Sequence, residues 1–197
     1  MNKFEIIKDL LIADRSIRRF EEGREIDSDT LKSLVNLTRF CASGRNLQPL
    51  KYILVTDKNK KEKLFPLLAW AGYLTDWPGP KEGERPAAYI IQCLDADITQ
   101  NCLCDDGLQI QAITIGATAL EIGCCIIKSF NVEKLKSLFE LSDNLKPLYV
   151  LALGFPKEEV VITELDKKDP EGYKYFRDSR GIHYVPKRSL EDIIVSN

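Results

Sequence analysis

The chain has 197 residues, of which 44% are hydrophobic, and this is enough to bury the core of one domain. Its 28 Lys and Arg are balanced by 30 Asp and Glu, so the formal net charge is only -2. The sequence therefore lacks the broad positive field of a nucleic-acid-binding protein. We expect a single domain over residues 1–197 and no nucleic-acid partner.

The N-terminal stretch MNKFEIIKDLLIAD interrupts its apolar positions with charges, which does not fit the continuous apolar core of a signal peptide. The most apolar window, residues 112–127, is shorter than the roughly 18 to 20 residues that span a bilayer and contains Glu121. We therefore expect a cytoplasmic protein with no membrane association.

Six cysteines and one histidine, His183, are the only candidates for soft metal ligands. The pairs Cys102/Cys104 and Cys124/Cys125 are too closely spaced for a zinc knuckle. In a reducing compartment we expect buried, free thiols and no metal site.

The first half of the chain predicts helices and one strand. Apolar residues at helical spacing indicate an amphipathic helix that ends near Asp14, and a second helix follows a cap at Asp27 or Ser28. Residues 52–55 predict a short buried strand, followed by a helix that Pro66 kinks or ends. Residues 72–86 are rich in Gly and Pro, which is typical of a long ordered loop.

The second half alternates strands and helices. Residues 87–94 and 147–155 predict central buried strands, and residues 107–123 predict a helix that runs into another strand. Asn131 is positioned to cap a helix that buries Val132, Leu135, Leu138 and Phe139. The sum predicts a mixed three-layer α/β/α domain.

Two short basic clusters raise the question of a ligand. RSIRRF, residues 15–20, is either a local ion-pair patch with Asp14, Glu21 and Glu22, or half of an anion site. VPKRSLEDII, residues 185–194, is the other cluster, and the two could converge on one dianion. The sequence contains no GxGxxG, P-loop or GxSxG motif, so any phosphate must be bound by side chains.

Four motifs in order resemble the nitroreductase family of FMN-dependent oxidoreductases. RSIRRF is similar to its N-terminal Arg-Ser-x-Arg motif, and ASGRNLQPLKYILV is similar to its Ser-x-x-Asn-x-Gln-Pro loop and following strand. ALEIGCCII resembles its Gly-containing helix-to-strand turn, and VPKRSLEDII its basic C-terminal motif. The resemblance implies an α+β fold in which helices flank a central, mainly antiparallel sheet.

The resemblance also implies a basic half of an FMN site. Arg15, Lys187 and Arg188 would hold the phosphate, while Ser16 and Arg18 would reach the ribityl chain and the pyrimidine edge. Arg18 would stabilise the reduced flavin electrostatically.

The other half would come from two further segments. Ser43 and Asn46, assisted by Gln48, would reach the flavin from the neighbouring subunit. Backbone amides of Ile122 and Gly123 would lie near its N5 and O4 atoms, where a glycine permits close approach. From the residues alone, a polar loop ended by a proline and a simple helix C-cap explain these two segments equally well.

The activity implied is hydride transfer from NAD(P)H through FMN to an electron-poor acceptor, such as a nitroaromatic, a quinone or an enone. FMN carries the chemistry, so no catalytic side chain is expected. The implied assembly is a homodimer with flavin sites at the interface, and the C-terminal segment 156–197 would extend over the partner. A non-redox FMN-binding protein and a cofactor-free chain with ion-paired ends remain alternatives.

Three positions depart from the family pattern. Asp14 stands where many relatives have a basic residue, Glu121 where the turn more often has glycine, and Leu50 where an aromatic residue is common. These departures bear on the substrate and leave the FMN assignment in place.

Overall fold

The computed structural model describes residues 2–195. Its helices are α1 (Lys3–Ala13), α2 (Ser28–Leu37), α3 (Lys58–Leu64), α4 (Asp105–Ala119), α5 (Val132–Leu138) and α6 (Leu190–Ile193). Its strands are β1 (Leu50–Val55), β2 (Ala88–Asp95), β3 (Gly123–Ile127), β4 (Leu145–Gly154), β5 (Val160–Glu164), β6 (Phe176–Arg177) and β7 (His183–Lys187). Short 3-10 turns occupy Thr38–Phe40, Gly44–Asn46 and Phe65–Leu67.

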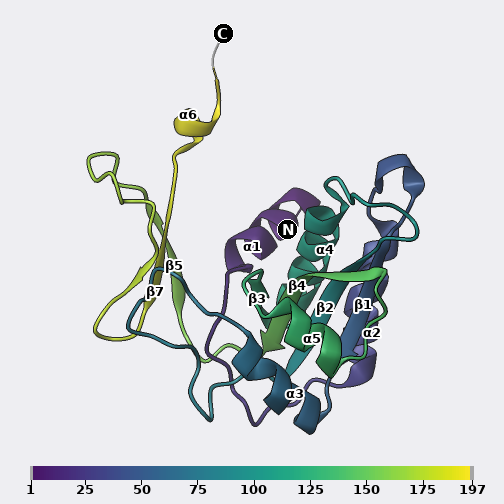
Figure 1. The fold of residues 1–197 in the computed structure, drawn as a ribbon. Helices are drawn as coiled ribbons and strands as arrows, with labels where there is room; N and C mark the ends of the chain where they lie inside the picture. Colours follow the sequence, from purple (N-terminus) through teal and green to yellow (C-terminus); the bar gives the residue numbers. More distant parts are fainter. Residues whose placement is uncertain (1, 196–197) are drawn as a thin grey trace.

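A four-stranded antiparallel sheet forms the centre, with the strand order β1-β2-β4-β3 (Figure 1). The register pairs Ile91 with Val150, and Cys125 with Ala152. The continuous apolar run of β2 is buried along almost its whole length, as expected for a strand covered on both faces. The predicted α+β fold with a central antiparallel sheet is confirmed.

Helices cover both faces of this sheet, because alternate strand residues point to opposite sides. On one side Leu64 of α3 and Leu135 of α5 pack with Ile91 and Val150. On the other side α2 and α4 pack against the alternate positions through Leu31, Leu34, Ile110, Ile113 and Ala117. Two cores therefore sandwich the sheet and give the three predicted layers (Figure 1).

Helix starts follow the side-chain caps in the sequence. The Asp27 carboxylate accepts a hydrogen bond from the Thr30 amide (2.6 Å), and Asn131 accepts one from the Lys134 amide (3.0 Å). After α3 a 3-10 turn containing Pro66 ends the helical run, as predicted. Val132 was expected to be buried but is 41% exposed, because it is the first residue of α5 and lies at the end of the helix, beyond the buried Leu135.

Helix α1 forms where predicted, but its apolar side chains are not buried in a core. Phe4 is 70% exposed and Ile7 is 54% exposed, and no residue of the helix is buried. In the single chain this apolar face of α1 is exposed to water. The amphipathic pattern of the helix therefore does not reflect packing against its own chain.

A second, three-stranded sheet with the order β5-β7-β6 was not predicted. β5 and β7 run parallel, with Ile162 opposite Val185, and β6 pairs antiparallel with β7. This sheet lies beside the main body, and beyond it α6 stands away from the rest of the chain (Figure 1). The C-terminal region thus carries regular structure where the sequence indicated only a covering segment.

The junction between α4 and β3 is a Schellman motif built on Glu121 instead of on a glycine. The Glu121 amide donates to Thr118 O (3.0 Å) and the Ile122 amide donates to Ala117 O (2.9 Å). Glu121 takes a left-handed φ of 60° to close these bonds. The helix therefore ends before Gly123, which is the first residue of β3 and not a C-cap.

We expect Glu121→Gly to raise the free energy of unfolding by about 0.5 to 1 kcal/mol. A left-handed backbone costs a residue with a side chain about 1 to 2 kcal/mol, and glycine avoids this cost. Glycine also makes the unfolded chain more flexible, which offsets part of the gain. Urea unfolding of the purified variant measures this change. Glu140→Gly is the matched control, because Glu140 (φ 52°) closes α5 in the same way and should give a similar gain.

The same replacement inside a helix should have the opposite effect. Glu62→Gly, on the exposed side of α3, is expected to lower stability by about 1 kcal/mol. A loss of stability in Glu121→Gly similar to that in Glu62→Gly would contradict the assignment of strain to this turn.

Candidate functional site

A cavity of about 290 Å³ opens beside the outer edge of β3. Both basic clusters reach it: Arg15, Ser16 and Arg18 from the segment after α1, and Lys187 from the end of β7. Asp14, at the end of α1, also lines it, and residues of α4, β3 and the C-terminal region complete the lining, namely Gln111, Thr114, Cys124, Ile126, Tyr175 and Val185. Side chains about 170 positions apart in the sequence are thus brought to one concave surface.

The basic segment is held along β3 by backbone pairing. The Ile17 amide donates to Cys124 O (3.0 Å), and Ser16 forms a parallel bridge with Cys124. A Cβ on Gly123 would lie 2.7 Å from Ile17 Cγ1, so the glycine makes room for Ile17. The side of Gly123 on which a Cβ would lie is therefore covered by a side chain of the same chain.

Arg15 has no carboxylate partner among residues 2–195. Its Nη2 donates to Leu11 O (2.8 Å), and its Nε is buried without a hydrogen-bond partner. The neighbouring carboxylate of Asp14 accepts from Thr114 Oγ1 (2.6 Å) and Gln111 Nε2 (2.7 Å) instead. The local ion-pair interpretation is therefore wrong for Arg15.

Arg18 is only 8% exposed, which is unusual for a guanidinium. Its Nη1 contacts Ser16 O (3.3 Å) and His183 Nε2 (3.2 Å), and its Cζ lies 4.8 Å from the centroid of the Tyr175 ring. Its Nε is also buried without a partner. The charge is thus held by an aromatic ring and neutral acceptors, and within the described chain it stays unneutralised.

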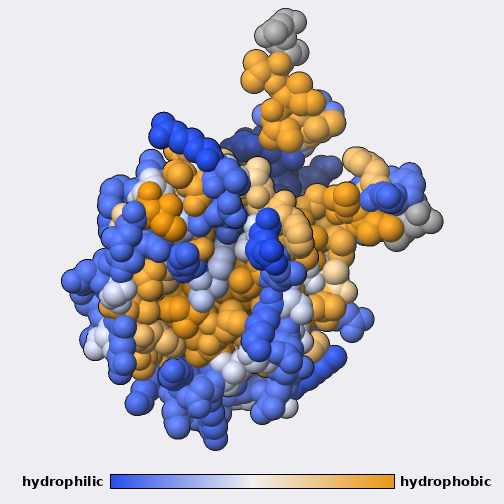
Figure 2. Space-filling view, turned by 90° about the vertical axis from the view of Figure 1, so that its right-hand side faces the viewer, coloured by the Kyte–Doolittle hydropathy of each residue, from blue (hydrophilic) through white to orange (hydrophobic). Residues whose placement is uncertain are grey.

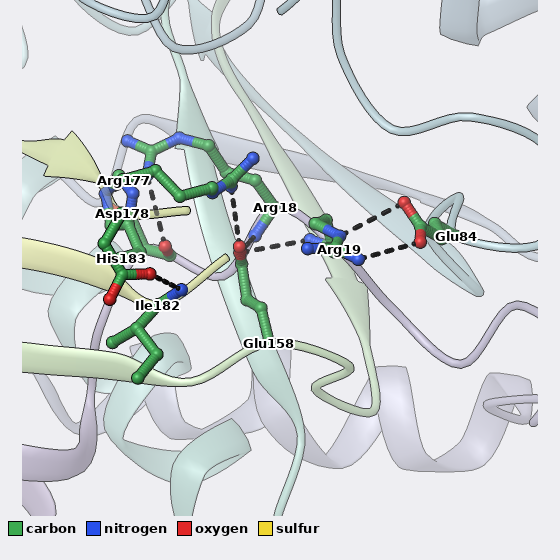
Figure 3. Close-up of polar contacts among 9 residues, drawn as sticks. Arg18, Arg19, Glu84, Glu158, Arg177, Asp178, Ile182 and His183 are labelled. Carbon is green, nitrogen blue, oxygen red and sulfur yellow. Dashed lines mark hydrogen bonds and ion pairs between the residues drawn. The ribbon is translucent and has the colours of Figure 1, made fainter. Parts of the chain in front are cut away.

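Arg19 points away from this cavity and forms an ion pair with Glu84, whose carboxylate accepts from Arg19 Nε (3.2 Å) and Nη2 (3.0 Å) (Figure 3). The hydrogen bond from Arg19 lowers the pKa of Glu84. This is the one arginine of RSIRRF that an ion pair explains, although its partner is Glu84 and not a flanking residue.

A buried carboxylate, Glu158, joins the basic segment to the second sheet (Figure 3). Its Oε1 accepts from the backbone amides of Arg18 and Arg19, and its Oε2 accepts from Arg177 Nη2 (2.8 Å). The Glu158 side chain is fully buried. It fixes the positions of Arg18 and Arg19 without neutralising the Arg18 guanidinium.

His183, to which the sequence analysis gave no role, lies under Arg18 and is 1% exposed. Burial, together with the nearby Arg18 and Arg177, lowers its pKa to about 4, so the ring is neutral at pH 7. A guanidinium can only donate, so His183 Nε2 must accept and the proton sits on Nδ1, which is buried without a partner. A lone histidine in an atypical segment offers no sequence signal for this contact.

Several predicted site residues lie away from this cavity in the same chain. Ile122 and Gly123 border a second hollow of about 340 Å³, which shares Arg15 with the first. Arg188 lines a separate hollow with Lys167, Asp169 and Asp192. The structure therefore brings Lys187, but not Arg188, to Arg15.

Two predicted polar contacts are already used within the chain. The Ile122 amide donates to Ala117 O as part of the α4 cap, so it is not free for a ligand. Ser43 Oγ donates to Asp105 Oδ2 (2.6 Å) and accepts from the Gln48 amide (2.9 Å). These contacts lie at the start of α4, whereas Gly123 follows its end. Asn46 and Gln48 are exposed on this loop and do not line the Arg15 cavity of their own chain.

The predicted long loop packs on the second sheet and does not line the cavity. The Tyr73 amide donates to the Tyr175 hydroxyl (3.3 Å), and Arg177 lies 4.9 Å from the Trp77 ring centroid. Because Tyr175 lines the cavity, the loop contacts the cavity only indirectly, through this residue.

The cavity has cationic groups but no activated nucleophile. Burial raises the pKa of Cys124, which lines it, well above the ordinary value, so the thiol stays protonated. All six cysteines are free, but only Cys93, Cys124 and Cys125 are buried as expected; Cys41 and Cys102 are partly exposed and Cys104 is exposed. Within residues 2–195 no group of three or more His, Cys, Asp or Glu side chains could hold a metal ion. The arrangement can bind and orient an anion.

No helix within the described part of the chain has the length and apolar character needed to cross a membrane.

Known proteins match both the sequence and this fold. Residues 13–87 match the model of the nitroreductase family. A protein named "CR(VI) reductase" from Pseudomonas sp. (strain G-1) is 26% identical over 172 residues, covering 77% of this chain and 67% of the relative. The resemblance to the nitroreductase family is thereby confirmed.

Solved structures show the same architecture. A nitroreductase family protein from Clostridium novyi NT aligns over 99% of this chain and 100% of its own, with 21% identity and a TM-score of 0.62. The NADPH:FMN oxidoreductase from Vibrio harveyi, solved with NAD+, covers 78% of this chain and 70% of its own, with 20% identity and a TM-score of 0.63. The chain therefore has the nitroreductase fold.

The lowered pKa of His183 predicts a pH-dependent stability. Between pH 6.5 and about 4 the unfolded chain binds a proton that the folded chain does not, so stability falls as the pH falls through this window. From pH 7 to pH 5 we expect this histidine to remove about 2 kcal/mol from the free energy of unfolding.

Urea unfolding at pH 7 and pH 5 tests this, with His183→Gln as the comparison. Carboxylates titrate in both proteins, so the difference between the two pH profiles isolates the histidine. Parallel profiles would show that His183 is not held neutral beside Arg18.

Proposed function

We propose that this chain is an NAD(P)H-dependent oxidoreductase that uses FMN to reduce an electron-poor acceptor. The observation that carries the proposal is the cavity in which Arg15, Arg18 and Lys187 meet without a carboxylate side chain paired to any of them in the described chain. The fold and the names of similar proteins, one of them an NADPH:FMN oxidoreductase, support it.

A terminal phosphate suits these cations. Arg15 and Lys187 project from different elements into one cavity, and charge-assisted hydrogen bonds to phosphate are about twice as strong as neutral ones. Two buried guanidinium Nε atoms without partners, in Arg15 and Arg18, are the kind of orphaned donors that a bound polar group satisfies. The residues present therefore fit FMN.

The remaining residues are assigned by position. Ser16 and Arg18 border the same cavity as the phosphate cations and would bind the ribityl chain and the polar edge of the ring. Ile122 and Gly123 border the adjoining hollow and would contact the ring by packing, since the Ile122 amide is engaged. When bound, FMN supplies hydride acceptance from NAD(P)H and hydride donation to the acceptor, while the protein binds, orients and excludes water.

A cavity of about 290 Å³ is at the small end for cofactor sites, which is consistent with a site that a second subunit extends. We propose a homodimer in which Ser43, Asn46 and Gln48 of one chain approach the basic cavity of the other. The exposed apolar side chains of α1 and of the C-terminal segment support this assembly. They include Phe4, Ile7, Leu190, Ile193, Ile194 and Val195.

The C-terminal segment stands clear of the body of its own chain, and its surface is strongly apolar (Figures 1 and 2). Val195 is 90% exposed and Ile193 is 64% exposed in the single chain. A segment of this composition is stable in water only against another surface, and the partner subunit offers one.

The proposal predicts that the purified chain binds FMN and that NADH or NADPH bleaches the bound flavin. Lys187→Ala should weaken FMN binding by about 1.5 to 3 kcal/mol, the usual value of a hydrogen bond to a charged group. Titration of the apoprotein, followed by flavin fluorescence, measures this change.

Arg188→Ala is the matched control, because Arg188 is adjacent in sequence and lines another hollow. Its FMN affinity should stay within about twofold of wild type, a difference of roughly 0.4 kcal/mol. Equal losses in both variants would show that the phosphate lies elsewhere. Flavin that binds but is not bleached by NAD(P)H would favour the non-redox binding protein.

The shared site is tested by subunit mixing. A chain carrying Asn46→Ala and a chain carrying Arg15→Ala should each lose activity, and a mixture should recover one intact site per heterodimer. Sedimentation of the wild type reports the assembly directly. An active, FMN-loaded monomer would overturn the dimer, and mixed chains no more active than either parent would overturn the sharing of residues between subunits.

A further inference from the structure

The loop Ser43–Gln48 has an unusual backbone. Three of its residues, none of them glycine, have left-handed φ angles: Arg45 (54°), Asn46 (56°) and Gln48 (51°). Such angles raise the free energy of a side-chain-bearing residue and persist only where the surroundings impose them. A short exposed loop does not impose this conformation by itself.

The group that imposes it is Asp105, in the first turn of α4. Asp105 is 1% exposed, and its two carboxylate oxygens hold the start of the loop. Oδ2 accepts from Ser43 Oγ (2.6 Å) and Oδ1 accepts from the Gly44 amide (2.9 Å). Ser43 Oγ in turn accepts from the Gln48 amide (2.9 Å), so the carboxylate fixes both ends of the loop.

Close packing supports the same conformation. A Cβ on Gly44 would lie 2.6 Å from Leu103 Cδ1, so the loop rests directly on the turn that leads into α4. Leu103 itself has a left-handed φ of 54°. Two neighbouring segments are thus strained where they meet.

The loop presents its polar side chains outward. Asn46 and Gln48 are exposed, and Gln48 Nε2 donates to Asn46 O and to Asn46 Oδ1 (both 3.2 Å). We propose that Asp105 is a positioning residue that holds this loop preorganised for the flavin site of the partner subunit; this role rests on the proposed function above. Preorganisation matters because a loop that is ordered before binding does not have to lose that entropy on binding.

A carboxylate is a stronger partner than an amide in this role. In an asparagine only Oδ1 accepts, so Nδ2 would have to donate to Ser43 Oγ, and the contacts with Ser43 and Gly44 would lose the charge of the carboxylate. Asp106 is the matched control: it is the next residue in the same turn, carries the same charge, and its carboxylate accepts only from the Gly107 amide.

The test compares Asp105→Asn, Ser43→Ala and Asp106→Asn in the full-length chain. The first readout is tryptic cleavage after the exposed Arg45, followed by mass spectrometry in the absence of flavin. We expect cleavage about tenfold faster in both loop variants, because Asp105→Asn removes the charge from the contacts with Ser43 and Gly44, and Ser43→Ala removes the hydroxyl that joins Asp105 to the Gln48 amide. Asp106→Asn should be cleaved at the wild-type rate.

The second readout is the dissociation constant for FMN, which a merely structural role would leave unchanged. We expect it to rise about tenfold in Asp105→Asn and in Ser43→Ala, and to remain unchanged in Asp106→Asn. Urea unfolding checks that each variant is folded. If Asp105→Asn does not fold, the cleavage rate of Ser43→Ala, measured without flavin, still tests the contacts that order the loop.

Two results would overturn the positioning role: unchanged cleavage in both loop variants, or faster cleavage with unchanged FMN affinity. Wild-type protein that binds no FMN would overturn the proposed function and this role with it. Cleavage, measured without flavin, distinguishes that failure from failure of the Asp105 contacts.

Discussion

The buried carboxylate of Glu158 is the constraint on which the site depends. A fully buried charge is tolerated only if its oxygens are satisfied, and Glu158 is satisfied by two backbone amides of the basic segment and by Arg177 of β6. These partners belong to two parts of the chain, which the contacts of Arg18 with His183 and Tyr175 also join. Removing the carboxylate would leave Arg177 without its ion pair and would take two hydrogen bonds from the segment that carries Arg15 and Arg18. Glu158 therefore helps to hold two walls of the cavity together.

The positive charge of the cavity survives because nearby carboxylates are engaged elsewhere. Asp14 is held by Thr114 and Gln111, and Glu84 is held by Arg19. Arg18 is covered by an aromatic ring and by a histidine that burial keeps neutral. Asp14 keeps its charge at the cavity, but its hydrogen bonds orient it toward Thr114 and Gln111 and not into an ion pair with Arg15 or Lys187. An anionic ligand would supply the direct ion pairs that these two cations lack within the described chain, and this links the packing of the region to its binding chemistry.

The parts of the fold that the sequence predicted correctly are those set by local signals. Caps at Asp27 and Asn131 and the apolar run of β2 determine structure over a few neighbouring residues. The second sheet was missed because the paired residues of the parallel strands β5 and β7 are 23 positions apart, and β6 has only two residues. Contacts such as Arg18–His183 and Arg18–Glu158 join residues 165 and 140 positions apart. A single sequence carries no periodicity that reports pairings of that kind.

The site residues divide along the same line. Charge alone predicted that Arg15, Lys187 and Arg188 converge. In the structure Arg15 and Lys187 line one cavity and Arg188 lines another hollow, because alternate residues of an extended segment point to opposite sides. The strand that delivers Lys187 also leads directly into the exposed apolar α6. One cation of the cavity and the segment that needs a partner surface are therefore separated by only a few residues. If α6 is anchored on a second subunit, the end of β7 is anchored with it, and Lys187 is ordered by the same contact. Subunit association and the binding of an anion then become energetically coupled, because each orders the end of β7 and so lowers the entropic cost of the other.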